Sequence, residues 1–115
     1  MPSKKYLSML GMARRAGKLS MGHDMALKAI KNHKAKLLIF ASDVSPRLIN
    51  EFNTQTERYN KSIICCNVEE TINELYAALG YKAGVITVDD ANFSNRITQL
   101  IASNEWYKTG GNSVW

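Results

Sequence analysis

The sequence has few cysteines and no long apolar run. Its two cysteines, Cys65 and Cys66, are adjacent, so they can hardly bridge each other without strain, and they lack metal-site spacing. We interpret them as small apolar residues of a buried strand. No apolar stretch is long enough to cross a bilayer, and the first 15 residues (MPSKKYLSMLGMARR) are too interrupted for a secretory signal. We therefore expect a soluble cytoplasmic protein without a membrane partner.

Patterns that indicate catalysis or metal binding are also missing. No glycine-rich loop between a strand and a helix matches a dinucleotide or phosphate site. His23 and His33 have no cysteine, carboxylate pair or second histidine at ligand spacing, and His33 lies on an apolar helix stripe that favours partial burial. Asp43, Asp89 and Asp90 follow predicted strands, where we expect each to cap a helix. We expect no catalytic residue, no cofactor and no metal site.

Charge is plentiful and unevenly distributed. The chain has 15 Lys and Arg against 10 Asp and Glu, a net charge of +5. Residues 1–36 hold nine basic residues and one acid, Asp24, which gives +8, while residues 37–115 hold six basic residues and nine acids, which gives −3. A basic third beside a mildly acidic remainder indicates one positive face that attracts a polyanion such as nucleic acid. A generally soluble surface is the plainer alternative.

Apolar residues alternate between helical spacing and short continuous runs along the chain. This α-β-α-β-α-β-α-β-α order predicts an α/β protein, a single-domain three-layer α/β/α sandwich around a central mixed sheet of about four strands. The domain is expected over residues 1–104, followed by a C-terminal tail over residues 105–115. Strands are predicted over residues 18–21, 37–41, 62–66 and 85–88, and helices over residues 4–16, over residues 22–32, from Ser45, after residues 67–70, and from Asp89 or Asp90.

Polar residues and glycines mark the ends of several predicted helices. Ser45 precedes Pro46 as an N-cap followed by the first helical residue. Residues 67–70 (NVEE) resemble a capping box with asparagine in place of serine or threonine. Gly17 and Gly80 stand where helices are expected to end. The helix before Gly80 is expected to bury one apolar stripe: Ile72, Leu75, Tyr76 and Leu79.

The positive signal for function lies in residues 14–28 (RRAGKLSMGHDMALK). Gly22 begins a helix directly after a short strand and lets another backbone approach closely. The helix start exposes unpaired N–H groups and a positive dipole end, which suits phosphates. Asp24 and Lys28 share one helix face, where a carboxylate can accept hydrogen bonds from bases and a lysine can reach phosphate. An ion pair between these two side chains on a solvated face is the alternative.

At this junction the sequence resembles the kink-turn-binding ribosomal-protein superfamily of the L7Ae and L30e type, specifically its small bacterial members. The resemblance runs through residues 4–102, in the segments LGMARRAGKLSMG, GHDMALKAIKNHKAKLLIFASDVS, SIICCNVEE and LGYKAGVITVDDANFSNRI. It implies an α/β/α sandwich without enzymatic activity. It also implies binding to an RNA with a sharp bend that is stabilised by tandem sheared G·A pairs.

The resemblance further implies that two elements meet the RNA. One is the start of the second helix, which enters the RNA groove. The other is the loop at residues 80–84, where apolar or aromatic side chains pack on a flipped-out nucleotide. The RNA-binding residues expected on this basis are Lys18, Gly22, His23, Asp24, Met25, Lys28, Tyr81, Lys82 and Ala83.

The middle of the helix start departs from the pattern Gly-x-Asn-Glu-x-x-Lys of the best-known members. Gly22 and Lys28 fit the pattern. Asp24 replaces the asparagine and loses its amide donor, and Met25 replaces the glutamate and loses a charged acceptor. Because each good base contact is typically worth about 1–3 kcal/mol, we predict that RNA is bound with weaker or altered kink-turn selectivity.

The expected partner is structured RNA, either ribosomal RNA or another kink-turn RNA, in association with the ribosome or translation, and we expect a monomer. One alternative is a non-enzymatic adaptor that binds a protein through the tail aromatics Trp106, Tyr107 and Trp115, which could equally pack on the domain's own core. Another is a small flavodoxin-like enzyme, or the substrate-recognition domain of an RNA ribose methyltransferase. Binding that falls steeply with salt would favour the RNA-binding hypothesis over these alternatives.

Overall fold

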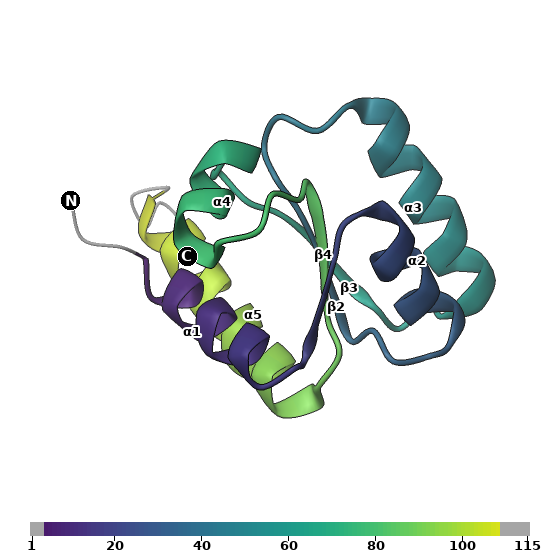
Figure 1. Cartoon of the computed structure of the whole chain (residues 1–115), viewed down its shortest axis with the longest axis horizontal. Coiled ribbons are helices and arrows are strands. Elements are labelled where there is room, and N and C mark those ends of the chain that lie inside the picture. Colours follow the sequence, from purple (N-terminus) through teal and green to yellow (C-terminus); the bar gives the residue numbers. More distant parts are fainter. Residues whose placement is uncertain (1–3, 109–115) are drawn as a thin grey trace.

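The computed structural model describes residues 4–108, with side chains described as far as residue 102. Over this part of the chain, five helices alternate with four strands in the predicted order (Figure 1). The helices are α1 (Lys5–Arg15), α2 (His23–Lys31), α3 (Pro46–Tyr59), α4 (Ile72–Leu79) and α5 (Ala91–Lys108). The strands are β1 (Leu19–Met21), β2 (Leu37–Phe40), β3 (Ile64–Asn67) and β4 (Val85–Val88).

The four strands form one mixed sheet in the order β1-β4-β2-β3. Strand β4 pairs antiparallel with both β1 and β2, and β2 pairs parallel with β3. Helices α1, α4 and α5 cover one face of the sheet, and α2 and α3 cover the other (Figure 1). The predicted three-layer sandwich with a mixed sheet of four strands is confirmed.

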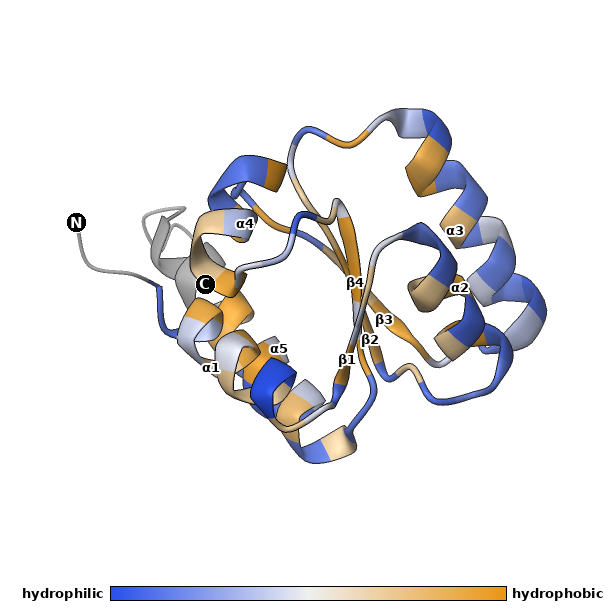
Figure 2. Ribbon diagram, in the orientation of Figure 1, coloured by the Kyte–Doolittle hydropathy of each residue, from blue (hydrophilic) through white to orange (hydrophobic). Residues whose placement is uncertain are grey.

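The central strands β2 and β4 are buried at every position, which explains the continuous apolar run of β2. In β4 the buried polar residue Thr87 donates its hydroxyl to Asp89. Because successive side chains of a strand point to opposite faces, β2 feeds two apolar clusters. Leu37 and Ile39 pack on the side of α1, α4 and α5, and Leu38 and Phe40 pack on the side of α2 and α3. Figure 2 shows this hydrophobic centre between helices whose outer turns are largely hydrophilic.

Strand β3 lies at an edge of the sheet, which changes the environment of the two cysteines. Cys65 is exposed and Cys66 is partly buried, and Ile64 is 46% exposed. Both cysteines lie in a strand as predicted, but the prediction that they are buried there is wrong. An apolar run identifies a strand, but a strand at an edge has a neighbour on one side alone.

Helix α2 ends at Lys31, two residues before His33. His33 follows the helix with a positive φ of 61°, and the next amide, that of Lys34, donates to the carbonyl of Ala29 at 2.9 Å. This is the ending usually built around glycine, as at Gly17 (φ 74°) after α1. His33 is exposed, so its predicted place on the buried stripe is wrong: the chain leaves the helical period at Lys31.

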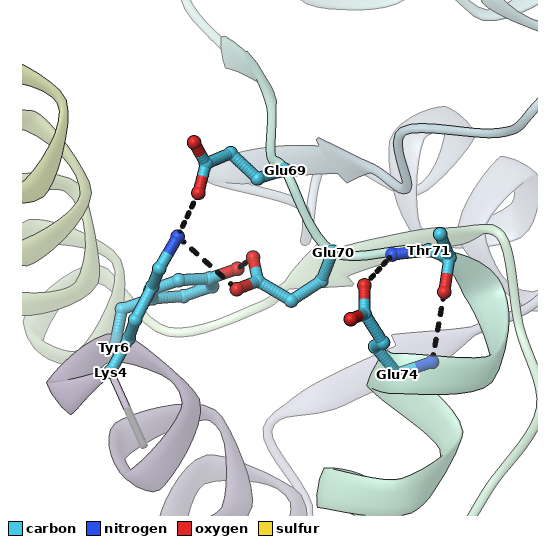
Figure 3. A network of polar contacts seen from close by, with 6 residues as sticks. All are labelled: Lys4, Tyr6, Glu69, Glu70, Thr71 and Glu74. Carbon is cyan, nitrogen blue, oxygen red and sulfur yellow. Dashed lines mark hydrogen bonds and ion pairs between the residues drawn. The ribbon is translucent and has the colours of Figure 1, made fainter. Parts of the chain in front are cut away.

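The start of α4 is capped by residues that lie later and farther away than predicted. Thr71 and Glu74 form the capping box, each side chain bonding the other's backbone amide (Figure 3). The box expected at residues 67–70 is therefore wrong. Asp43, from the loop after β2, accepts a hydrogen bond from the Ile72 amide at 2.9 Å, so it caps α4 from a distant segment.

The apolar stripe of α4 is narrower than predicted. Leu75 and Leu79 are buried, and Ile72 is partly buried, but Tyr76 is 50% exposed. Consecutive helical residues point about 100° apart, so Leu75 and Tyr76 cannot both face the core from an eight-residue helix. The expected inward position of Tyr76 is wrong.

A polar network joins the start of α1 to the loop between β3 and α4 (Figure 3). The Tyr6 hydroxyl donates to Glu70, and the Lys4 ammonium pairs with Glu69 and lies 3.2 Å from Oε2 of Glu70. Burial and the neighbouring Glu70 carboxylate raise the pKa of the Tyr6 hydroxyl well above its ordinary value. The network fixes α1 against the second half of the chain.

Helix α5 runs to Lys108, past the residue at which the tail is expected to begin. The side chains of Trp106 and Tyr107 and the whole of Trp115 lie outside the described residues, so the aromatic contacts expected of the tail are untested. Within residues 4–108, no helix is both long and apolar enough to span a membrane.

Candidate nucleic-acid interface

Glycine at position 22 sets the start of α2. Its φ of 95° belongs to the region that side chains with a Cβ rarely adopt. A Cβ there would meet nothing within 4 Å, so the need for glycine is conformational rather than one of space. The Gly22 carbonyl accepts the Ala26 amide at 2.9 Å, which begins the helix. The predicted role of this glycine as a helix start after a short strand is confirmed.

The structure brings the two predicted RNA-contacting elements together. The Gly22 amide donates to the Val85 carbonyl at 2.9 Å, and the Gly84 carbonyl accepts the Ala41 amide at 2.9 Å. Met21 pairs with Ile86 across the sheet. The start of α2 and the loop at residues 80–84 therefore lie at the same end of the paired strands β1 and β4, although they are far apart in sequence.

The residues of this loop differ in what they can offer a ligand. Tyr81 is 47% exposed and Lys82 is exposed, so both side chains are accessible. Ala83 is buried, with 5% of its surface exposed, so its methyl group belongs to the core rather than to a nucleotide site. Of the predicted loop residues, Tyr81 and Lys82 can act through their side chains.

The outer face of α2 carries the predicted helix residues at the surface. Met25 is 54% exposed, the Asp24 side chain is fully exposed at 100%, and Lys28 is exposed. Within the described part of the chain, Asp24 pairs with His23 and forms no ion pair with Lys28. The alternative interpretation, in which these two charges neutralise each other, does not describe the folded helix.

A hollow of about 520 Å³ runs between the edge strand β1 and α2. Lysines from three segments line it: Lys18 before β1, Lys28 on α2 and Lys34 after α2. No carboxylate among residues 4–102 forms an ion pair with any of these three lysines. The full lining is Gly17, Lys18, Leu19, Ser20, Met25, Lys28, Ala29, Asn32, Lys34 and Asp89.

Sequence reasoning missed Asn32 and Lys34 as part of this surface. Asn32 stands four residues after Lys28, and helical spacing could have placed it on the same side. Lys28 and Asn32 also line a second hollow of about 320 Å³, together with Asp24, Leu27 and Lys31. Lys34 carries no such signal, because it follows the left-handed turn that ends the helix.

Asp89 is a carboxylate of the hollow, and its hydrogen bonds hold the strands together. Ser20 on β1 donates to it at 2.6 Å, and Thr87 on β4 donates at 2.8 Å. Its neighbour Asp90 accepts the Phe93 amide at 2.9 Å and caps α5. Of the two aspartates considered as caps for this helix, Asp90 is the cap and Asp89 is not.

His23 stands between two carboxylates from different helices. Its Nδ1 lies 3.1 Å from Oδ1 of Asp24, and its Nε2 lies 2.8 Å from Oε2 of Glu51 on α3. These two carboxylates, Glu51 first, raise the pKa of the imidazole against a small opposing effect of burial. The contact with Glu51 is absent from the sequence prediction, because it joins residues 28 positions apart.

No group of three or more His, Cys, Asp or Glu side chains in the described residues is arranged to hold a metal ion. The exposed groups of α2 and of the loop at residues 80–84 are those of a binding surface. It combines accessible ammonium groups, an exposed carboxylate, an exposed thioether and an exposed phenol around a helix start. Cationic groups with apolar platforms suit phosphates and unstacked bases.

Comparisons with known proteins agree on one family. The sequence matches the ribosomal protein L7Ae/L30e/S12e/Gadd45 family over residues 4–98. The RNA-binding protein YlxQ of Bacillus subtilis (strain 168) is 29% identical over 102 residues, which cover 88% of this chain and 99% of that protein. The large ribosomal subunit protein eL30 of Yarrowia lipolytica (strain CLIB 122 / E 150) is 30% identical over 94 residues, which cover 77% of this chain and 82% of that protein.

Solved structures share the fold. A protein of unknown function from Bacillus halodurans C superposes with a TM-score of 0.76 at 32% identity, over 87% of this chain and 99% of that one. The 15.5kD RNA binding protein of Giardia lamblia superposes with a TM-score of 0.66 over 91% of this chain and 92% of that one. At 17% identity, the second likeness concerns the fold alone.

Proposed function

Because the chain belongs to the ribosomal protein L7Ae/L30e/S12e/Gadd45 family, as its sequence resemblance predicts, we propose that it binds structured RNA. The binding surface is the start of α2 together with the loop at residues 80–84. The observation that carries this proposal is the hydrogen bond from Gly22 to Val85, because it joins the start of α2 to the residue that follows the loop. RNA-binding relatives of similar length support the same function.

The lysines of the surface are suited to the phosphate backbone. Lys18, Lys28 and Lys34 reach the solvent around one hollow, and Lys82 is exposed in the loop. Phosphate contacts supply affinity and position the protein, whereas base contacts supply specificity. In this function Met25 and Tyr81 offer apolar and aromatic surface to unstacked bases.

Selectivity for a kink-turn is the finer part of the proposal. Asp24 and Met25 stand where the best-known family members have asparagine and glutamate, so this chain reads the G·A pairs with fewer donors and acceptors. We expect a kink-turn duplex to be bound more tightly than the same duplex with its G·A pairs mutated. The difference in affinity should be smaller than the sum of several base contacts. The protein acts in the cytoplasm as a non-enzymatic monomer, on ribosomal RNA or another structured RNA of translation.

The first experiment compares lysine variants by gel shift on one kink-turn RNA. Lys28→Ala and Lys82→Ala are expected to weaken binding without unfolding the domain, because both side chains are exposed. Lys61→Ala is the matched control, because Lys61 is exposed and precedes β3 at the opposite edge of the sheet from β1. Unchanged affinity for Lys28→Ala together with lost affinity for Lys61→Ala would show that the proposed face is wrong.

The second experiment tests selectivity with two RNAs and the wild-type protein. One duplex carries the tandem G·A pairs, and the other has them replaced by Watson–Crick pairs. Equal affinities would remove kink-turn selectivity and leave general RNA binding. Affinity should also fall steeply between low and moderate salt, because counterions are released when lysines neutralise phosphates.

A further inference from the structure

The contacts of His23 favour the protonated form of its ring. Both ring nitrogens lie within hydrogen-bond distance of a carboxylate oxygen, Nδ1 at 3.1 Å from Asp24 and Nε2 at 2.8 Å from Glu51. An ionised carboxylate only accepts hydrogen bonds, and a neutral imidazole has a single N–H. Both contacts are satisfied together when the ring is an imidazolium. The raised pKa of His23 agrees with this geometry.

The His23 ring also packs against the hydrophobic core. The rings of His23 and Phe52 meet edge to face, with 5.3 Å between centroids and an interplanar angle of 83°. Phe52 is fully buried and packs in the same manner on Phe40 of the central strand β2, at 6.2 Å and 78°. Edge-to-face contacts of this kind favour one ring orientation. His23 is therefore held by α3 on one side and by the sheet beneath.

The fixed His23 ring in turn restricts the side chain of Asp24. Its side chain is fully exposed, and an exposed aspartate ordinarily samples several rotamers. Here one oxygen, Oδ1, is tied to the anchored imidazolium, and Oδ2 has no hydrogen-bond partner among the described residues. The carboxylate thus points into solvent at the start of α2 in one preferred orientation.

We propose that Glu51 and His23 are positioning residues that orient the Asp24 carboxylate to accept hydrogen bonds from a guanine in the bound RNA. The inference rests on the proposed RNA-binding function and names how one of its residues is held. A carboxylate repels phosphate, so its partner on RNA is a base donor rather than the backbone. Guanine presents N1–H and N2–H side by side on one edge, whereas adenine and cytosine present a single amino group there.

The charged groups that contact His23 come from both helices packed around it. They are Asp24 from α2 and Glu51 from α3, and the third neighbour, Phe52, is apolar. Glu51 acts on Asp24 through the imidazole: it keeps the ring protonated, and the protonated ring holds Oδ1. Removal of Glu51 should lower the pKa of His23 and release Asp24.

The test exploits a conflict of sign. Glu51→Gln removes a negative charge beside the proposed RNA face, and simple electrostatics predicts tighter binding of RNA. Loss of the positioning residue predicts weaker binding instead, by about threefold to tenfold for one side chain that must be ordered on binding. Glu57→Gln is the matched control, because Glu57 is exposed on the same helix α3 and its substitution removes the same charge.

Binding is measured to a guanine-containing kink-turn RNA across pH 5.5–8.5, and the His23 pKa of the free protein is measured by NMR. In the wild type, affinity should fall as pH rises through the raised pKa, because the protonated ring exists below it. In Glu51→Gln this fall should move to lower pH, and replacement of guanine by inosine, which lacks the N2 amino group, should cost the wild type more than the variant.

Two outcomes overturn the inference and one overturns its premise. Glu51→Gln binding as tightly as Glu57→Gln, or more tightly, would show that Glu51 positions nothing. An ordinary His23 pKa in the free wild-type protein would show that the imidazolium bridge is not formed. Failure of the wild type to bind any structured RNA would instead overturn the proposed function, which distinguishes the two.

Discussion

The backbone amide of Gly22 donates a hydrogen bond to the carbonyl oxygen of Val85 at 2.9 Å. This bond joins the start of α2 to the first residue of β4, directly after the loop at residues 80–84. At its positive φ of 95°, Gly22 also turns the chain from the end of β1 into α2. Gly22 therefore takes part in both features of the proposed RNA surface, the turn that begins α2 and the contact with β4 next to the loop.

Gly22→Ala is expected to lower the free energy of unfolding by about 1–2 kcal/mol, because a residue with a Cβ is strained at a φ of 95°. Chemical denaturation measures the change. Gly11→Ala is the control: Gly11 lies within α1, and its Cβ would meet only the Arg15 guanidinium at 3.7 Å. That variant should be more stable by about 0.5–1 kcal/mol. Equal effects at the two glycines would contradict the conformational argument.

Lys34→Gln is expected to weaken RNA binding and to reduce the salt dependence of affinity, because Lys34 lines the hollow between β1 and α2. Each lost phosphate contact lowers the slope of log affinity against log salt by about 0.9. Lys36→Gln is the control, since Lys36 is exposed two residues later and does not line the hollow. The same slope for both variants would place the RNA elsewhere.

His33→Gly is expected to stabilise the protein by about 0.5–1 kcal/mol, because glycine relieves the left-handed strain at a φ of 61° at some cost in unfolded-state entropy. His33 is exposed, so little packing is lost. The midpoint of thermal unfolding should rise accordingly, and a lower midpoint would show that the imidazole contributes a stabilising contact.

Tyr6→Phe is expected to lower stability by about 1–2 kcal/mol near neutral pH, because the buried hydroxyl donates to the Glu70 carboxylate. The raised pKa of Tyr6 means that the folded protein keeps this proton when the unfolded chain, with an ordinary pKa of 10.0, releases it. The contribution is therefore complete below that pH and declines above it. Parallel urea titrations of both proteins at pH 7 and pH 10.5 measure the decline, and a constant difference would contradict the raised pKa.

Local pattern is enough to predict the elements whose surroundings are uniform. The strand expected over residues 85–88 is found with the same bounds, because β4 is buried on both faces and three of its four residues are apolar and β-branched. Ser45 and Pro46 begin α3 as predicted, with the Ser45 hydroxyl accepting the Leu48 amide at 3.1 Å. Both signals lie within a few residues of the feature that they predict.

The predictions fail where the answer depends on a distant segment. Nothing in the run around Cys65 distinguishes an edge strand from a central one, because strand order follows from pairing between remote parts of the chain. The cap that Asp43 provides for α4 and the contact of His23 with Glu51 have the same origin. At the candidate site, the helix start at Gly22 can be predicted locally, whereas the neighbours that orient its side chains cannot.

The strand order β1-β4-β2-β3 also has a consequence for synthesis of the chain on the ribosome. Strand β1 is made early, but within residues 4–108 it pairs in the sheet with β4 alone, which is made late. A nascent chain that ends before Val85 can pair β2 with β3 but leaves β1 and the start of α2 without a sheet to join. The proposed binding surface is thus complete only after β4 has emerged, so we expect a chain that ends before Val85 to lack it.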